Sequence, residues 1–169
     1  MDGVAVLVDG FGRIGELVHG AVDGLDQEQL TARLGPEAST IAWLMWHLAR
    51  VEDAQVAPLA GTEQVWTSQG FAEKFDLPFG RRTTGYGQTP DQVAQVRTDA
   101  DLLLAYADAT HRATAAYLAT LQDTDLGRVV DDDWDPPVTV GVRLVSVLGD
   151  VLEHAGQAAF VRGVLTSQG

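Results

Sequence analysis

The chain has 169 residues, of which 46% are hydrophobic, and this size and composition predict one globular domain with a sizeable core. Its 24 acidic and 11 basic residues give a net charge of −13, which argues against nucleic acid or an anionic membrane surface as a partner. There is no cysteine, which excludes disulfides, zinc–thiolate sites and a thiol nucleophile supplied by the protein itself.

The chain also lacks the patterns that would place it in or across a membrane. No apolar run approaches the roughly 18 residues of a membrane span. Near the start, only a short apolar run separates Asp2 from Asp9, which is unlike a secretory signal. We therefore expect a cytoplasmic protein with no membrane partner.

The sequence predicts a first helix over residues 3–25. Val4, Phe11, Val18 and Leu25 recur at every seventh position, and further apolar residues follow three and four places after them. This spacing is typical of an amphipathic helix that faces a core.

The same segment contains GFGRIG at residues 10–15, which matches the G-x-G-x-x-G loop of dinucleotide-binding proteins. Such a loop requires a strand before it and a second parallel strand that ends in an acidic residue about 20 positions further on. Here the helical spacing of apolar residues continues through the glycines, and no alternation of strands and helices follows. We therefore predict no nucleotide-binding site, in a helix that its glycines weaken.

Residues 39–59 predict a second helix, which Ser39 can cap and which Pro58 helps to end. Trp43 and His47 lie beside its apolar face. That face is made of Ile41, Leu44, Met45, Leu48 and Val51.

Charged and aromatic residues near His47 have simple structural interpretations. We expect Arg50, Glu52 and Asp53 to form the charged outer face of the second helix. The tryptophans of this helix, and Trp134 further along the chain, are expected to pack in the core or at its boundary.

Residues 61–88 show no helical spacing, and a connection of this length favours a crossover along a bundle. A third helix over residues 90–122 begins with a capping box made by Thr89 and Gln92. After a loop rich in aspartate and proline, a fourth helix spans residues 139–165.

The four predicted helices, without a convincing pair of strands, indicate an all-α fold. We expect a four-helix bundle with a long crossover between its second and third helices, formed as a single domain by residues 1–169. Thr139 is expected to cap the fourth helix.

The strongest candidate site involves Asp150 and His154, which stand four residues apart and so share one face of the fourth helix. Buried polar groups need partners, and the simplest interpretation is that these two side chains bond to each other. The alternative adds His47 from the second helix. Two histidines and one carboxylate that converge from two helices would bind a divalent metal and leave positions open for water or substrate.

The other titratable residues have weaker claims. His19 lies off the apolar face of its helix and is expected to be solvated, whereas His111 is expected at the core boundary. Arg143 and Arg162 on the fourth helix can orient an anionic cofactor, but ion pairs on the helix surface explain them equally well.

Two segments carry a resemblance to a known family: IAWLMWHLARVED in the second helix and VGVRLVSVLGDVLEHAGQAAFVRG in the fourth. On these segments the chain resembles the DinB-like superfamily, and within it the members related to mycothiol-dependent maleylpyruvate isomerase. The resemblance implies a four-helix bundle of the DinB type, with the long crossover described above, assembled as a homodimer.

The resemblance also implies a divalent metal, held by one residue of the second helix and two of the fourth. The matching positions are His47, Asp150 and His154. Many relatives have histidine at all three positions, so Asp150 leaves the metal open among zinc, nickel, manganese and iron. Four further residues are candidates for supporting the ligands or orienting a cofactor: Trp43, Arg143, Gln157 and Arg162.

The function that the resemblance implies is that of a metal-dependent thiol S-transferase, with mycothiol the favoured cofactor. The metal would bind a small-molecule thiol and lower its pKa, and the thiolate would then attack an electrophile. The absence of cysteine agrees with a nucleophile that arrives with the cofactor. The alternative is a dimeric bundle that binds metal, or a small ligand or partner, and catalyses nothing.

Overall fold

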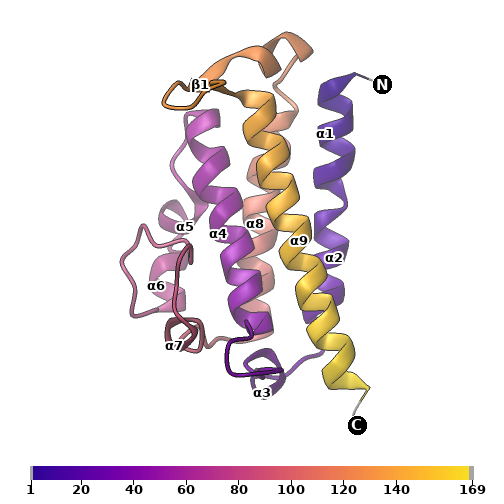
Figure 1. The fold of residues 1–169 in the computed structure, drawn as a ribbon, viewed down its shortest axis with the longest axis vertical. Helices are drawn as coiled ribbons and strands as arrows, with labels where there is room; N and C mark the ends of the chain where they lie inside the picture. Colours follow the sequence, from indigo (N-terminus) through magenta and orange to yellow (C-terminus); the bar gives the residue numbers. More distant parts are fainter. Residues whose placement is uncertain (1, 168–169) are drawn as a thin grey trace.

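Long helical segments run alongside one another and form a bundle (Figure 1). The computed structural model describes residues 2–167. The long segments are α1 (Gly3–Gly12) continued by α2 (Ile14–Val22), then α4 (Ile41–Ala60), α8 (Ala100–Leu118) and α9 (Val140–Thr166). α4 packs against both α8 and α9, and α2 closes the bundle on the opposite side. The prediction of an all-α four-helix bundle is confirmed.

The first helical segment is divided at Arg13, whereas the sequence predicted one continuous helix. The backbone N–H of Arg13 bonds to the carbonyl of Gly10, which tightens the turn that ends α1. GFGRIG therefore spans the end of α1 and the start of α2 and follows no strand, in agreement with the rejection of a nucleotide loop. Gly10 has a packing role, because a Cβ atom there would come within 2.6 Å of the Leu148 side chain on α9.

α4 is capped by Thr40, one residue after the predicted cap, and the Thr40 hydroxyl accepts a hydrogen bond from the Trp43 N–H at 3.1 Å. Nearly every side of this helix is covered. The prediction that Arg50, Glu52 and Asp53 form a charged outer face is wrong, since all three are buried. The segment between α4 and α8 covers Arg50 and Asp53, and Glu52 lies against Thr114 of α8. Helical spacing alone cannot reveal such a cover.

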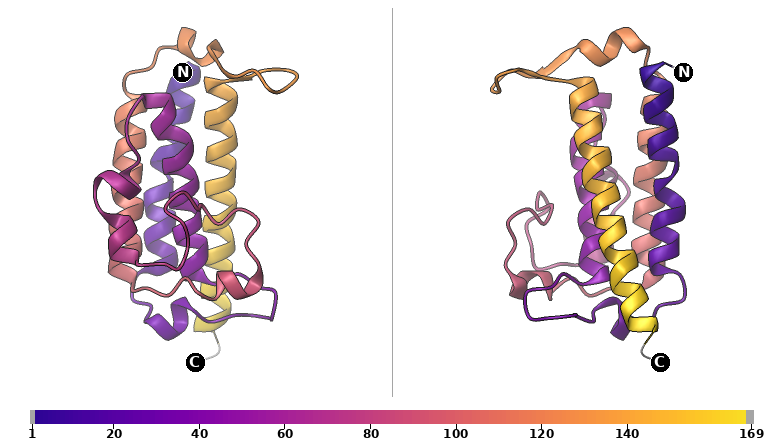
Figure 2. Two further views of the ribbon diagram at one scale, coloured as in Figure 1. Left: turned by 90° about the vertical axis from the view of Figure 1, so that its left-hand side faces the viewer. Right: turned by 45° about the vertical axis from the view of Figure 1, so that its right-hand side comes forward.

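The connection between α4 and α8 lies outside the bundle and runs along α4 (Figure 2). It contains three short helices: α5 (Val65–Ser68), α6 (Phe71–Phe75) and α7 (Pro90–Val93). The predicted capping box of Thr89 and Gln92 is present, but the helix that it starts ends at Val93. Asp99 caps a new helix by accepting a hydrogen bond from the Leu102 N–H at 2.8 Å, so the predicted third helix is split in two.

A small antiparallel hairpin lies at one end of the bundle, where the sequence predicted only a loop (Figure 1). After α8 the chain forms a 3-10 turn, η1 (Asp123–Gly127), and then pairs β1 (Val129–Asp131) with β2 (Val138–Thr139). α9 follows at once, and the Thr139 hydroxyl caps it as predicted, by accepting a hydrogen bond from the Val142 N–H at 3.3 Å. The hairpin is thereby fixed to the start of α9.

α9 has 27 residues and is the longest described helix. It carries Asp150, Glu153 and His154 within two turns. Within residues 2–167, no helix combines the length and the apolar character needed to cross a membrane.

Candidate metal centre

α4 and α9 pack along each other and bring the three predicted ligands together. His47 on α4 is buried, and Asp150 and His154 on α9 are partly buried. Each of the three offers one ligand atom, and these atoms lie within 4.8 Å of one another. Among the residues that the structure describes, His47, Asp150 and His154 form the group of histidine and acidic side chains that could hold a metal ion.

Both histidines are oriented through the ring nitrogen Nδ1. His47 Nδ1 lies 2.5 Å from the carbonyl oxygen of Thr84, and because a carbonyl only accepts, Nδ1 is the protonated nitrogen. His154 Nδ1 lies 2.9 Å from Oε1 of Gln157, which is also an oxygen that only accepts hydrogen bonds. In both rings Nε2 is left with a lone pair, which is the arrangement that histidine ligands of metals adopt.

Asp150 has a buried oxygen atom that the protein leaves unsatisfied. Its Oδ2 has no hydrogen-bond partner within residues 2–167. Its Oδ1 lies 3.7 Å from His154 Nε2, which is longer than a hydrogen bond. The simple interpretation, in which Asp150 and His154 satisfy each other, is therefore not met. An orphaned carboxylate oxygen beside two imidazole lone pairs fits a cation.

The surroundings of His47 keep its ring neutral. Burial lowers the pKa of His47 below its ordinary value of 6.5, and the nearby His154 acts in the same direction. The hydrogen bond to the Thr84 carbonyl and the Asp150 carboxylate oppose this shift. A neutral imidazole is the form that binds a metal, so the shift favours ligation near neutral pH.

Trp43, one of the predicted supporting residues, stacks on His47. The ring centroids are 4.5 Å apart and the ring planes are inclined by 16°. The indole N–H donates to Oε1 of Gln88 at 2.6 Å, which ties the tryptophan to the segment that precedes α7. Trp43 lies one turn before His47 on α4, and its stacking therefore fixes the plane of the His47 ring.

Gly85 is a supporting residue that sequence reasoning missed. Its φ is +103°, a conformation that favours glycine, and a Cβ atom there would lie 2.6 Å from His47 Nδ1. The absence of a side chain lets the Thr84 carbonyl approach the histidine. The glycines of this segment were visible in the sequence, but nothing in the sequence indicated which histidine the segment would meet.

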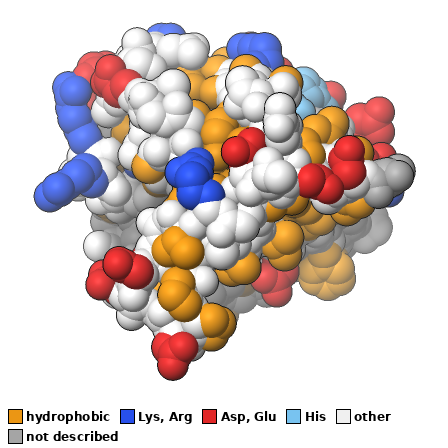
Figure 3. Space-filling view, turned by 90° about the horizontal axis from the view of Figure 1, so that it is seen from above, with side chains coloured by type: hydrophobic (Ala, Val, Ile, Leu, Met, Phe, Trp, Pro, Cys, Tyr) orange, Lys and Arg blue, Asp and Glu red, His pale blue; other side chains and the backbone are white. Residues whose placement is uncertain are grey.

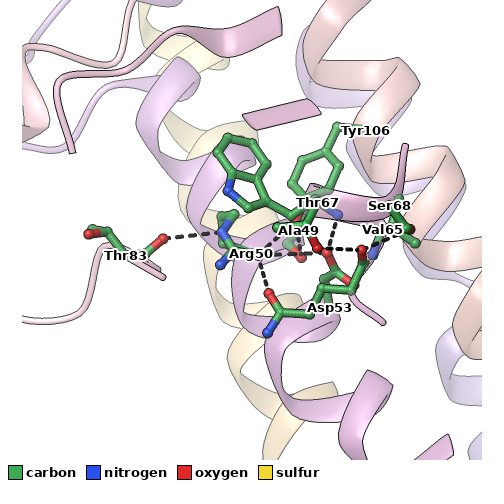
Figure 4. Close-up of polar contacts among 10 residues, drawn as sticks. Ala49, Arg50, Asp53, Val65, Thr67, Ser68, Thr83 and Tyr106 are labelled. Carbon is green, nitrogen blue, oxygen red and sulfur yellow. Dashed lines mark hydrogen bonds and ion pairs between the residues drawn. The ribbon is translucent and has the colours of Figure 1, made fainter. Parts of the chain in front are cut away.

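A buried polar network holds this segment against α4 (Figure 4). The Arg50 side chain donates from Nε to the Thr83 carbonyl at 3.1 Å and from Nη1 to Gln64 Oε1 at 3.0 Å. The Asp53 carboxylate accepts from the backbone N–H groups at the start of α5, at 2.8 and 2.7 Å, and from the Tyr106 hydroxyl at 2.9 Å. Arg50 and Asp53, which the sequence predicted on the surface, therefore hold the segment between α4 and α8 against α4.

A pocket of about 630 Å³ adjoins the triad, with His47 and Asp150 among its lining residues. Arg143 lines it as well and bonds to Asp131 of β1 at 3.0 Å and to Gln55 of α4. Arg162 does not line this pocket. The structure thus brings three of the four predicted supporting residues to the site or its pocket: Trp43, Arg143 and Gln157.

One other prediction needs correction. Trp134 was expected to pack in or near the core, but its side chain is 67% exposed and lines the pocket. The His19 side chain is 41% exposed, in agreement with a solvated residue, and its Nε2 also lies 3.1 Å from the Asp108 carboxylate on α8. His111 lies at the boundary as expected, where burial lowers its pKa.

The bundle with its long crossover has the fold of the DinB-like superfamily, which confirms that resemblance. Within it, the chain belongs to the mycothiol-S-transferase family, whose sequence model matches residues 11–167. A crystal structure of a conserved protein from Enterococcus faecalis has the same fold, with a TM-score of 0.88 and 32% sequence identity over 96% of each chain. No curated protein matches the chain.

Proposed function

We propose that this protein is a divalent-metal-dependent thiol S-transferase that uses mycothiol. One observation carries the proposal: two imidazoles and an unsatisfied carboxylate converge beside a pocket, in a chain of the mycothiol-S-transferase family. The chain has no cysteine, so a sulfur nucleophile has to enter with a small molecule.

The three side chains of the triad would hold the ion. His47 and His154 present Nε2 because their Nδ1 atoms are engaged by Thr84 and Gln157, and Asp150 presents its orphaned oxygen. This donor set of two nitrogens and one carboxylate oxygen suits zinc, nickel, manganese or iron. A divalent ion, when bound, supplies Lewis acidity that lowers the pKa of a thiol and makes thiolate available near neutral pH.

The rest of the site would position the reactants. Trp43 covers one face of the His47 ring, and the buried Arg50 network holds the Thr84 carbonyl in place, so the ligands are fixed before any substrate arrives. The pocket beside the triad offers room for an electrophile next to the thiol.

The first experiment measures metal in protein purified without a nickel column. We expect about one equivalent of a divalent transition metal per chain. His47→Ala and Asp150→Asn should lose most of it, whereas His19→Ala, which removes a histidine outside the triad, should retain it. Metal content far below one equivalent in the wild type, or unchanged content in both triad variants, would contradict the proposal.

The second experiment separates an enzyme from a bundle that binds metal without catalysis. Consumption of an electrophile is followed with and without mycothiol, for the metal-loaded wild type and for Asp150→Asn. We expect thiol-dependent consumption by the wild type only. If the protein binds metal and the rates equal those without protein, the non-catalytic alternative is correct.

We also propose that the protein forms a homodimer. In support, hydrophobic side chains stand exposed on the first and last helices, including Val6 at 55% and Val145 at 61%. Light scattering on the purified protein tests this, and a monomer at micromolar concentration would contradict it.

A further inference from the structure

The pocket beside the triad is a groove between α4 and α9 that runs toward the hairpin. His47 and Gln55 mark its length along α4, and their separation of eight positions corresponds to about 12 Å. On α9 the lining residues extend from Asp150 back to Val142, near the point where the hairpin joins the helix. A molecule that reaches the triad therefore lies along this groove and meets the hairpin at its far end.

An apolar wall extends between the triad and the hairpin. Four valines from three elements contribute to it: Val51, Val138, Val142 and Val147. Val142, near the hairpin end of the groove, is 52% exposed. Apolar surface that stays in contact with water is stabilised when an apolar ligand covers it, so this wall favours an apolar group over a hydrated one.

Two exposed aromatic side chains line the groove from separate segments. Trp134 lies between the two hairpin strands and is 67% exposed, and Tyr86 lies beside the Thr84–Gly85 segment and is 93% exposed. Neither ring packs against another aromatic ring within residues 2–167, unlike Trp43, Trp46 and Trp66. Unpaired aromatic faces suit a flat ring that can stack against them.

The charges of the groove disfavour an anion. Arg143 is the basic residue among those that line it, and its guanidinium already bonds to the Asp131 carboxylate at 3.0 Å. Asp132, Asp133 and Asp135 follow on the exposed hairpin loop. Viewed from the hairpin end, acidic side chains are spread over the molecule, with hydrophobic side chains exposed between them (Figure 3). At the hairpin end of the groove, away from the triad, an anionic group would find the Arg143 charge already paired and would approach a negative surface.

We propose that the electrophile is an uncharged, planar, apolar molecule that lies on the valine wall and stacks against Trp134. This inference rests on the proposed function, since it names the second substrate of the same site. With an aryl halide as the electrophile, the reaction is a substitution of the halide by the thiolate. The thiolate sulfur forms a bond to the ring carbon, the carbon–halogen bond breaks, the halide leaves with the bonding electrons, and the thiol proton passes to solvent.

Two electrophiles of nearly equal shape test the charge selection. 4-Chloro-3,5-dinitrobenzamide is uncharged, and 4-chloro-3,5-dinitrobenzoate carries a carboxylate at the same position. With mycothiol as the thiol, kcat/KM for each is divided by its rate without protein. We expect this ratio to favour the amide by about tenfold or more. A ratio that is equal for the two, or that favours the benzoate, overturns the proposal.

Variants test the two residues to which the proposal gives roles. Trp134→Ala should lower kcat/KM for the amide by about fivefold. Phe160→Ala is the matched control, because Phe160 is also 67% exposed but lies outside this groove, and it should have no effect. For the benzoate, Asp131→Asn should raise the ratio of kcat/KM to the rate without protein by about tenfold, because it frees the charge of Arg143. Equal effects of Trp134→Ala and Phe160→Ala overturn the proposed stacking.

Binding of unreactive ligands separates this inference from the proposed function. 3,5-Dinitrobenzamide and 3,5-dinitrobenzoate lack the chloride, and their affinities are measured by calorimetry on the metal-loaded protein and on Trp134→Ala. Tighter binding of the amide, weakened by Trp134→Ala, supports the inference even if no electrophile is consumed. In that case the proposed function alone fails. Equal binding of the two ligands overturns the inference whatever the catalytic result.

Discussion

At the scale of single residues, the site depends on contacts that keep His47 in one orientation. The Thr84 carbonyl and the Trp43 ring both contact this histidine, and Gly85 provides the space for the first of these contacts. Residues that orient metal-binding histidines commonly change metal affinity by about 10- to 100-fold when they are replaced. Gly85 can therefore be tested without touching a ligand.

Gly85→Ala should weaken metal binding at least about tenfold, because its Cβ would lie 2.6 Å from His47 Nδ1 and would displace the ring. Competition with a chelator measures the affinity. Gly87→Ala is the matched control. Gly87 also has a positive φ, of +71°, but a Cβ there meets nothing within 4 Å, so this variant has the backbone strain without the collision. Equal loss of affinity in both variants would show that His47 is not positioned in this way.

Glu52 gives a pH-dependent prediction. Burial raises its pKa from an ordinary value of 4.5 to about 7, against the opposing hydrogen bond from Thr114. The folded protein therefore holds this proton more tightly than the unfolded chain. Its free energy of unfolding should fall as the pH rises from about 4.5 to about 7, and should not fall further for this reason above that range.

Glu52→Gln should remove this dependence while it retains the shape of the side chain. Relative to the wild type, the variant should become more stable as the pH rises, by up to about 3 kcal/mol at pH 8. Urea denaturation at pH 5, 6, 7 and 8 provides the measurement. A stability difference that stays constant over this range would show that Glu52 does not titrate as described.

At the scale of elements, the segment between α4 and α8 is held by side chains of α4. Asp53 accepts the two backbone hydrogen bonds that start α5, and it lies 3.6 Å from the buried Arg50 guanidinium. A carboxylate in this position stabilises the short helix and balances a buried charge. The segment that orients His47 is thereby attached to the same helix as His47.

Asp53→Asn should destabilise the protein by about 3 kcal/mol, since it leaves the buried Arg50 without its charge partner and removes one acceptor. It should also increase hydrogen exchange in α5 and in residues 83–85, which can be followed by mass spectrometry. Glu63→Gln, an exposed acidic residue two positions before α5, should change neither quantity. A loss of stability without faster exchange in α5 would mean that Asp53 does not anchor this segment.

The sequence predicted the long helices best where spacing and caps agree, as in α9, which Thr139 caps as expected. It failed where two signals compete. Thr89 and Asp99 are both good caps, and the structure uses both, so one predicted helix became α7 and α8. The buried Arg50 and Asp53 could not be foreseen, because helical spacing describes one helix and not the segment that later covers it.

At the scale of the whole molecule, the bundle brings together residues that lie about a hundred positions apart. The spacing of Asp150 and His154 placed them on one face of α9, the place of His47 beside the apolar face of the second helix made it a candidate third ligand, and the family resemblance pointed to the same three residues. The other parts of the site arise from the crossover and the hairpin. Gly85, Trp134 and Asp131 lie in irregular segments, where the position of a side chain depends on tertiary contacts that no local pattern encodes.

Metal binding should stabilise the whole fold, because the ligands are assembled only in the folded chain. Addition of a strong chelator should lower the melting temperature of the wild type by several degrees. Asp150→Asn should melt at the same temperature with and without chelator. A chelator effect of equal size in the wild type and in Asp150→Asn would place the metal elsewhere.

The most direct test of the central claim is the optical spectrum of the cobalt(II)-substituted protein, recorded before and after the addition of mycothiol. Cobalt held by His47, Asp150 and His154 should show ligand-field bands, and the thiol should add a charge-transfer band that signals sulfur bound to the metal. Asp150→Asn should show neither change at the same concentrations. A spectrum that mycothiol leaves unaltered would contradict the claim that this centre activates a thiol.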